Sequence, residues 1–317
     1  RDIYGMDYED AARLIYEDDI DILIEFSGHM ANNLLGVSAY KPAPVLVSFL
    51  AVNTTGMRAY DYRITDKWYN PVETDKYFVE KNIRLPNANI CYKPYADTPD
   101  IHLPPVTRNG YITFGSFNNS CKITPSTVSL WSGVLKQVPG SRMILKFGGG
   151  ADSGMIRRFF EAFERHGVAR DRVAIFGYMP ADEHLQLYNH VDISLDTWPF
   201  SGCLTTLESL WMGVPVITIY SEKLASRGSL SILKTLGLDA FASSDENGYV
   251  AAAAALASKT DALKRLRSTM RQRLKNSPLF DYEDYTRAFE SALKEIWRKY
   301  CDNRAAGRGE KMDKNYP

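Results

Sequence analysis

The chain has 317 residues, of which 45% are hydrophobic and 24% charged, and its 38 basic side chains equal its 38 acidic ones. This length is enough for two domains with hydrophobic cores, and this composition is that of an ordinary globular protein. A net charge of zero argues against a dedicated binder of nucleic acid or of an anionic membrane surface.

The apolar runs argue against a membrane-spanning protein, and the cysteines argue against a protein held together by disulfides or zinc. No apolar run approaches the roughly 18 residues of a membrane-spanning helix. The four cysteines, Cys91, Cys121, Cys203 and Cys301, lie far apart and form no CxxC pair. They predict reduced thiols in a cytoplasmic protein rather than a disulfide framework or a zinc site.

Residues 1–100 predict an N-terminal lobe in which strands alternate with helices, the pattern of a parallel sheet. We expect a helix over 7–18, a buried strand over 20–26 and further strands at 45–50, 62–65 and 83–85. Because the chain opens at Arg1 without a methionine, we expect it to be a piece of a longer protein.

A polar segment rich in proline, residues 94–110, predicts the boundary between two lobes, which we place at residue 100. Strands then alternate with helices over 101–280, the pattern of a doubly wound parallel sheet. The expected strands are 111–117, 143–147, 173–176, 193–195 and 216–219, and the expected helices begin near 125, 152, 181, 205, 226, 246 and 259. A C-terminal helix, 281–301, and a flexible tail, 302–317, complete the prediction.

The loop after the first strand of the second lobe is one candidate anion site. In open parallel sheets, ligands bind beyond the carboxyl ends of the strands, where helix N-termini offer free N–H groups. Thr124 suits an N-cap and Pro125 the first helical position. Lys122, just ahead of them, would hold its ammonium over a docked phosphate. The alternative is that Lys122 is an ordinary surface lysine.

The loop from Asp196 to Glu208 is the second candidate anion site. Hydroxyl groups and Gly202 precede the expected helix, which would let a diphosphate approach the backbone closely. The competing interpretation needs no ligand, since Thr205 and Glu208 have the spacing of a capping box. Both interpretations can hold together, because the Thr206 hydroxyl would remain free.

Two histidines and one acidic motif are further candidates. His29 begins the loop after an apolar strand, where an acid/base group would lie, although a lone histidine there is more often structural. His184 lies at a helix start and could stack on a base. The DxD-like run 19–21 enters a strand at its N-terminal end, so we interpret it as a helix–strand turn. No other cluster has convincing metal-ligand spacing.

Ordered motifs run along nearly the whole chain. In the first lobe they are Arg1-Asp2-Ile3-Tyr4-Gly5-Met6, Gly28-His29 with Ala31-Asn32-Asn33, Lys41–Pro44, Thr54-Thr55-Gly56 and Asp61–Asp66. In the second they are Phe114–Asn119 with Lys122-Ile123, Ser194–Thr197, Thr205-Thr206 with Glu208, and Gly213-Val214-Pro215, and the expected C-terminal helix adds Trp297–Cys301. Together they resemble the catalytic region of the O-GlcNAc transferase and Spindly family of protein O-glycosyltransferases. Several stretches are closer to Spindly than to animal O-GlcNAc transferase.

The resemblance implies a GT-B fold, in which two Rossmann-like lobes face each other across a cleft and the second lobe holds a nucleotide sugar. It implies inverting transfer of a single sugar to Ser or Thr hydroxyls of proteins without a metal or other cofactor. UDP-GlcNAc is the donor that the family as a whole implies, and the Spindly-like features imply GDP-fucose as the alternative. Tetratricopeptide repeats are expected upstream in the parent protein, and neither nucleic acid nor membrane is an expected partner.

The resemblance also implies roles for individual residues. Lys122 and Asn119 lie on the diphosphate side, and Thr205 and Thr206 are phosphate ligands. Glu208 contacts the ribose and His184 the base. His29 is the visible candidate for an acid/base or acceptor-side role, beside Lys122 as the residue that neutralises the leaving group.

Three departures from the animal enzymes bear on these roles. Glu208 stands where they have an aspartate, and Ala181 and Leu187 stand where they have basic residues near the base pocket. The resemblance also implies that the first strand of the N-terminal lobe lies outside the chain, as does the histidine that the animal enzymes carry just before the segment at Arg1-Asp2.

Two rival functions follow from the same residues. One is a nucleotide-sugar-binding scaffold that has lost catalysis, against which the intact Lys122 and Thr205–Thr206 loops argue. The other is a transferase that acts on asparagine or on a small glycan.

Overall fold

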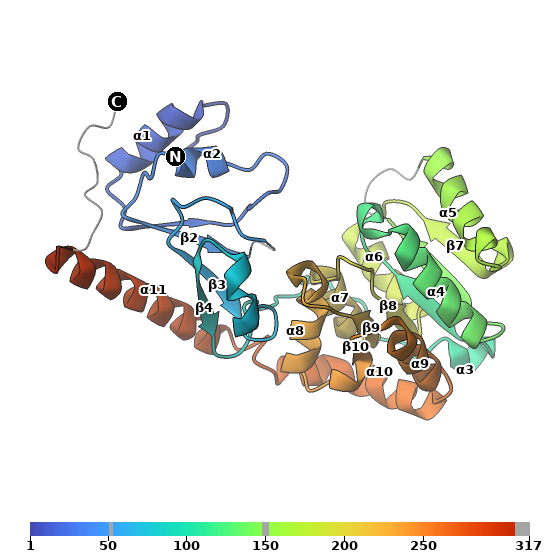
Figure 1. Ribbon diagram of the computed structural model, residues 1–317. Coiled ribbons are helices and arrows are strands. Elements are labelled where there is room, and N and C mark those ends of the chain that lie inside the picture. Colours follow the sequence, from blue (N-terminus) through green and yellow to red (C-terminus); the bar gives the residue numbers. More distant parts are fainter. Residues whose placement is uncertain (51–52, 148–151, 308–317) are drawn as a thin grey trace. The chain divides into compact units, whose positions relative to one another are not determined.

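The computed structural model describes residues 1–50, 53–147 and 152–307 (Figure 1). The chain forms two compact units, one of Arg1–Ile90 with Tyr282–Pro317 and the other of Cys91–Asp281. Each unit contains a parallel sheet, so the predicted Rossmann-like α/β class is confirmed. The run of three glycines at 148–150 lies outside the described residues.

The first unit is built on a four-stranded parallel sheet in the order β1-β2-β3-β4. Its elements are α1 (Tyr8–Glu17), β1 (Ile22–Glu25), α2 (Leu35–Ser38), β2 (Val45–Phe49), β3 (Tyr62–Asp66), the 3-10 helix η1 (Val72–Tyr77), β4 (Lys81–Leu85) and α11 (Tyr282–Ala305). The α1 helix begins where the Asp7 carboxylate accepts a hydrogen bond from the Asp10 amide, as an N-cap side chain does. All five helix and strand predictions for this lobe are confirmed within a few residues.

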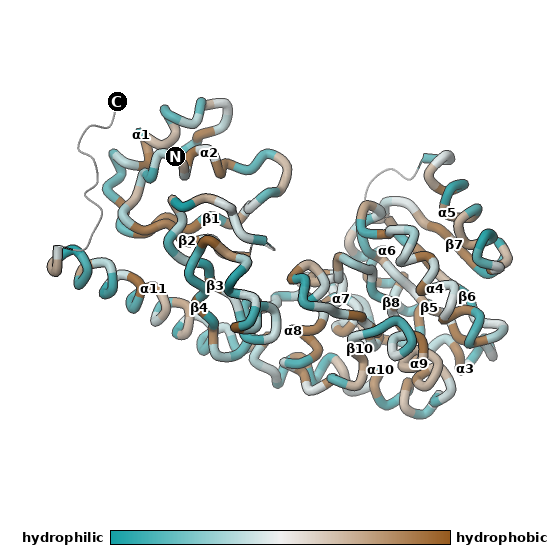
Figure 2. The backbone as a smooth tube through the Cα atoms, in the orientation of Figure 1, coloured by the Kyte–Doolittle hydropathy of each residue, from teal (hydrophilic) through white to brown (hydrophobic). Residues whose placement is uncertain are grey.

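The alternation of side chains in β2 gives this sheet two apolar faces. Val45 and Val47 pack on one face with Ile296 of α11, whereas Leu46 packs on the other face with Leu35 of α2. Figure 2 shows β2 in brown along most of its length and much of α11 in teal, as expected for a helix with one buried stripe.

The C-terminal helix departs from its predicted end. It runs to Ala305 rather than to residue 301, so the predicted tail begins inside the helix. Through Ala292 and Ile296 it contributes to the core of the first unit. Residues 308–317 lie outside the described part of the chain.

The second unit contains a six-stranded parallel sheet in the order β10-β9-β8-β5-β6-β7. Its strands are β5 (Thr113–Ser116), β6 (Arg142–Lys146), β7 (Val173–Phe176), β8 (Ile193–Leu195), β9 (Val216–Ile219) and β10 (Ala242–Ser243). Its helices are α3 (Val106–Asn109), α4 (Pro125–Gln137), α5 (Ser153–Arg165), α6 (Ala181–Leu187), α7 (Leu204–Trp211), α8 (Gly228–Thr235), α9 (Glu246–Ala257) and α10 (Thr260–Lys275). The five predicted strands are confirmed, and the two-residue β10 is an edge strand too short for a sequence signal.

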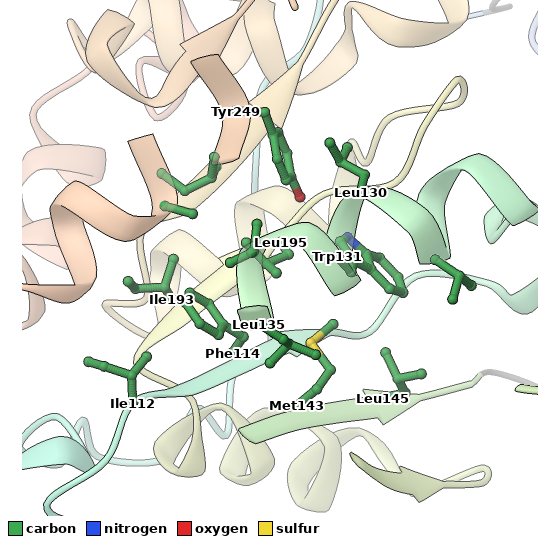
Figure 3. Packing of buried hydrophobic residues seen from close by; sticks show 14 of the residues in the cluster. Ile112, Phe114, Leu130, Trp131, Leu135, Met143, Leu145, Ile193, Leu195 and Tyr249 are labelled. Carbon is green, nitrogen blue, oxygen red and sulfur yellow. The ribbon is translucent and has the colours of Figure 1, made fainter. Parts of the chain in front are cut away.

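One face of this sheet carries the larger core of the unit, which α4, α5 and α9 cover. Figure 3 shows Trp131 of α4 and Tyr249 of α9 with their polar atoms turned inward near Leu195. Both atoms donate to the backbone carbonyl of Asp196, at 3.1 Å each, so the polar groups of these buried rings are satisfied. The end of β8 is thereby held by two helices that cover this face of the sheet.

The helices α6 and α7 lie on the opposite face. A Cβ on Gly115 of β5 would meet Val191, the residue after the 3-10 turn that ends α6, at 2.6 Å. The Ser194 hydroxyl of β8 bonds the Ser209 hydroxyl of α7 at 2.6 Å. The sheet is therefore covered on both faces, as parallel sheets are.

The proline-rich segment at 94–110 is fastened to α10 of the second unit. The Arg267 guanidinium, 2% exposed, donates to the carbonyl oxygens of His102, Val191 and Tyr188. Arg271 donates to the carbonyl oxygen of Pro99 at 3.0 Å. The contacts of the chain divide at Ile90, ten residues before the boundary expected from composition, because these arginines hold the segment.

No helix within the described ranges is long and apolar enough to cross a membrane.

Candidate functional site

The carboxyl ends of β5 and β8 bring the two predicted loops together in the second unit. These strands are neighbours, with Phe114 paired to Ile193. The loop after β5 leads through Asn118 and Lys122 to α4, and the loop after β8 leads from Asp196 to α7. This is the edge where an open parallel sheet receives its ligands.

The helix after the first loop begins as predicted. The Thr124 hydroxyl accepts from the Thr127 amide at 3.2 Å, and Pro125 is the first helical residue. The Lys122 ammonium lies ahead of this helix and donates to the carbonyl oxygen of Ser201 at 2.9 Å. It also lies 4.2 Å from the centre of the Phe200 ring. Lys122 thus joins the two loops instead of extending into solvent as a surface lysine.

Burial lowers the pKa of Lys122 below its usual value, and the negative charge of Asp196 opposes the shift. A partly buried ammonium whose bonded partner is a neutral carbonyl keeps its charge available to an incoming anion. The group therefore suits the stabilisation of negative charge at this edge of the sheet.

The alternative interpretation of Thr205 and Glu208 as a capping box does not hold at the start of α7. The N-cap is Cys203, which forms no side-chain capping bond, and the helix begins at Leu204. The Thr205 hydroxyl instead donates to Oδ1 of Asn118 at 3.0 Å, and the Glu208 carboxylate bonds His184. Both side chains therefore bond residues outside α7. The spacing of residues within one helix does not reveal such contacts.

Thr206 does not keep the free hydroxyl that the sequence suggested. Its side chain is 3% exposed and shares a 2.7 Å hydrogen bond with the Ser229 hydroxyl of α8. Gly202 packs directly on this pair of threonines, because a Cβ there would meet Thr206 Oγ1 at 2.5 Å and Thr205 Oγ1 at 2.9 Å. Only glycine fits between the loop and the first turn of α7.

Asp196 organises the second loop, a role that sequence analysis missed. Its buried carboxylate accepts from the amides of Thr197 and Gly202, at 2.8 and 2.7 Å, and from the Thr218 hydroxyl at 2.7 Å. Burial raises the pKa of Asp196, and these hydrogen bonds oppose the shift. The sequence signal for this role is an aspartate directly after an apolar strand, at the start of a loop that leads to a helix.

His184 and Glu208 form a buried pair. Nε2 of His184 lies 3.1 Å from Oε2 of Glu208, and the two residues are 8% and 4% exposed. In the described part of the chain, Nδ1 of His184 has no hydrogen-bond partner. The rings of Phe117 and Tyr188 lie 5.6 and 5.5 Å from the imidazole. The structure thus brings together the two side chains to which the resemblance gives the ribose and the base.

The two remaining predicted site residues, Asn119 and His29, form different contacts from those described above. Asn119 is exposed, and its Oδ1 accepts from the Cys121 amide at 3.1 Å. His29 belongs to the first unit, where its Nε2 lies 2.9 Å from the carbonyl oxygen of Thr54. The Glu80 carboxylate accepts from the Thr54 hydroxyl at 2.7 Å and from the Thr55 amide at 2.6 Å, so it orders the loop that His29 contacts.

The acidic run 19–21 forms the turn that its position predicted. Asp18 caps the C-terminal end of α1, and Asp19 follows in a left-handed conformation with φ of 48°. Among the residues that the structure describes, no three His, Cys, Asp or Glu side chains are grouped as a metal site requires.

Comparison with known proteins identifies relatives along nearly the whole chain. The sequence profile of glycosyl transferase family 41 matches residues 5–92 and 105–289. A tomato protein (Solanum lycopersicum) named "Probable UDP-N-acetylglucosamine--peptide N-acetylglucosaminyltransferase SPINDLY" is 41% identical over 95% of this chain. The Arabidopsis thaliana protein of the same printed function named SEC is 30% identical, also over 95% of this chain. This chain spans about a third of the length of these relatives, 33% and 31%.

Solved structures of other proteins also resemble this chain. A mutant of the Thermobaculum terrenum O-GlcNAc transferase is 34% identical, with a TM-score of 0.90 over 96% of this chain and 58% of that one. Anabaena HepE in complex with UDP and glucose is 14% identical, with a TM-score of 0.57 over 91% of this chain and 81% of that one, a likeness of fold alone. The predicted GT-B fold class is confirmed by these likenesses. The chain belongs to glycosyl transferase family 41.

Proposed function

We propose that this chain is the catalytic region of an inverting glycosyltransferase that moves a single sugar from a nucleotide donor to Ser or Thr hydroxyls of proteins. UDP-GlcNAc is the donor that the relatives' names print. The observation that best supports the proposal is the Lys122 ammonium, held 2.9 Å from the Ser201 carbonyl beside the first turn of α7.

The chemistry follows from the charge that develops on the leaving group. When the bond between sugar and diphosphate breaks, negative charge grows on the departing phosphate oxygen. Lys122 would stabilise this charge together with the free amides at the start of α7, near Thr205 and Thr206. An ammonium and a helix N-terminus would then supply the positive charge that a divalent cation supplies in other transferases, so we propose a metal-independent reaction.

The remaining predicted residues would bind the nucleoside. We propose that Glu208 accepts from a ribose hydroxyl and that His184 contacts the base, because their side chains form one buried pair. Asn119, which is exposed and lies three residues before Lys122, would lie on the diphosphate side. His29 stays the candidate for an acid/base or acceptor-side role, supported by its fixed contact with the Thr54 carbonyl.

The expected repeats and the expected location of the parent protein are also proposals. We propose tetratricopeptide repeats in the part of the parent outside this chain, since the relatives are about three times longer. A cytoplasmic location stays a prediction from the scattered cysteines.

The proposed function has two forms, which differ in the nucleotide sugar that serves as donor. Identity to the relative named SPINDLY is 41%, against 30% to the relative named SEC. The Spindly-like sequence features imply GDP-fucose, so this donor is the second candidate beside UDP-GlcNAc.

The test is a transfer assay on the full parent protein with UDP-GlcNAc and GDP-fucose in parallel, with mass spectrometry of the modified acceptor. We expect one donor to be consumed and the product to be O-linked to Ser or Thr. Lys122→Met should lower kcat about 10²–10³-fold, as the loss of one oxyanion-stabilising donor does. Lys136→Met, on the exposed end of α4, is the matched control and should leave turnover unchanged.

The same assay separates the rival functions. Nucleotide binding without any transfer would support a scaffold that has lost catalysis. Modification of asparagine or of a free glycan would replace the proposed acceptor class. Full turnover by Lys122→Met would contradict the proposed role of this residue.

A further inference from the structure

We infer that Lys146 is a further donor-binding residue, which donates a hydrogen bond to a carbonyl oxygen of the nucleobase and thereby selects uracil or guanine over adenine. The inference rests on the proposed function and adds to it a base-selecting residue at the end of β6, whereas the predicted site residues lie in loops and helices. Sequence analysis missed Lys146 because it lies within the apolar run 143–147, whose pattern predicts only a buried strand.

The register of the sheet places Lys146 beside the predicted base site. In the pairing of β5 with β6, Ser116 is opposite Leu145. The next residues, Phe117 and Lys146, therefore lie side by side at the carboxyl edge of the sheet. The Phe117 ring lies 5.6 Å from the ring of His184, the residue proposed to contact the base.

The alternation of side chains along β6 places Lys146 on the face of the sheet where His184 and Glu208 lie. Met143 and Leu145 of β6 point into the core that α4 and α9 cover. Lys146 has the opposite parity, so its side chain leaves the strand on the face that α6 and α7 cover. His184 of α6 and Glu208 of α7 bond each other on that face.

The Lys146 ammonium lacks a partner of its own in the part of the chain that the structure describes. Lys146 is 7% exposed. No hydrogen bond or ion pair joins it to any described residue, although the charge of Glu208 is close enough to oppose the lowering of its pKa by burial. Nζ of Lys146 is not among the fully buried side-chain atoms without a partner in the described residues, so the ammonium reaches the surface at this edge of the sheet, where a ligand can accept from it.

Its position differs from that of Lys122, the cation proposed for the diphosphate. Burial lowers the pKa of both lysines, but the charges that oppose this shift are those of Asp196, Cys203 and Cys121 for Lys122 and that of Glu208 for Lys146. The first cation therefore belongs to the loop at 196–203 and the second to the His184–Glu208 pair. An ammonium only donates hydrogen bonds. It matches the carbonyl oxygens of uracil or guanine and opposes the amino group that adenine presents.

The experiment measures binding of UDP, GDP, ADP and inorganic pyrophosphate by calorimetry to the full chain and to Lys146→Met. Methionine matches the unbranched shape of lysine without its charge. We expect the variant to lose about tenfold or more in affinity for UDP or GDP, whichever the wild type prefers, and to lose discrimination against ADP. Pyrophosphate affinity should not change. Lys146→Arg should retain part of the preference.

A thermal melt without nucleotide separates binding from packing. Because Lys146 forms no hydrogen bond or ion pair with a described residue, the variant removes no such contact, and its melting temperature should stay close to that of the wild type. Unchanged affinity for UDP and GDP would overturn the inference. So would an equal loss for pyrophosphate, or a lowered melting temperature. If the wild type binds neither UDP nor GDP, the proposed function itself fails and the inference fails with it.

Discussion

Nε2 of His184 on α6 lies 3.1 Å from Oε2 of Glu208 on α7, and both side chains are buried. This contact joins two residues that are 24 positions apart in the sequence. It replaces the local capping bond that Glu208 would otherwise form with its own helix. The pair fixes the orientation of the imidazole relative to the start of α7, where the diphosphate is proposed to bind.

Substitutions of Glu208 should separate its structural role, the hydrogen bond to His184, from its proposed role in binding the ribose. Glu208→Ala leaves His184 without its hydrogen bond and should destabilise the protein by about 1–3 kcal/mol, the cost of a buried polar group left unpaired. Glu208→Gln keeps an acceptor for Nε2 but loses the negative charge. It should melt near the wild-type temperature while its affinity for UDP and GDP falls about tenfold. Calorimetric titration and thermal denaturation check both variants, and equal effects of the two changes in both measurements would refute this division of roles.

Gly202 should tolerate no side chain. A Cβ in Gly202→Ala would lie 2.5 Å from Thr206 Oγ1, so the loop or the first turn of α7 must shift, at a cost of about 1–3 kcal/mol. We expect a lower melting temperature and weaker binding of UDP and GDP. Gly177→Ala is the matched control, since a Cβ there meets nothing within 4 Å. If Gly202→Ala binds nucleotide like the control, this loop does not form part of the donor site.

Arg267 should be a structural residue and not a binding residue. Its guanidinium satisfies the carbonyl oxygens of His102, Val191 and Tyr188, so Arg267→Met leaves buried acceptors unpaired. The free energy of unfolding should fall by about 2 kcal/mol or more. Arg265→Met, exposed on the same helix, should change it little. Denaturant titration measures both, and similar stabilities for the two variants would argue against this fastening of the segment at 94–110.

The ionisation of Lys122 should limit donor binding at high pH. Burial lowers the pKa of Lys122, so the ammonium loses its proton at a lower pH than an exposed lysine does. Affinity for UDP or GDP should be constant while the group is protonated and should fall as pH rises through this lowered pKa. A guanidinium stays charged throughout, so Lys122→Arg should remove the alkaline fall. Calorimetry over a pH series checks this, and an identical fall in both proteins would assign it to another group.

The loop at Lys122 could be predicted from the sequence because its signals are local. Thr124, Pro125 and the preceding strand indicate a helix start at the edge of a sheet, and such a start needs no knowledge of distant residues. The parallel sheets were predictable for the same reason, because apolar runs of four to seven residues alternate with helical patterns.

The contacts within the site were not predictable, because they join residues far apart in the chain. Thr205 and Glu208 have capping-box spacing, yet Asn118 and His184 bond them instead. The spacing of residues in one helix does not report which other elements pack against that helix. The partners of Asp196 likewise lie on a loop and on β9, and the buried position of Lys146 becomes visible only from the strand register.

The most direct measurement of the central claim is the dissociation constant of UDP and GDP for the wild type, Lys122→Met and Lys136→Met. Because a hydrogen bond to a charged group contributes about 1.5–3 kcal/mol, Lys122→Met should bind the preferred nucleotide about 10- to 100-fold more weakly. Lys136→Met should bind it like the wild type. Equal dissociation constants for all three proteins would contradict a diphosphate site at Lys122.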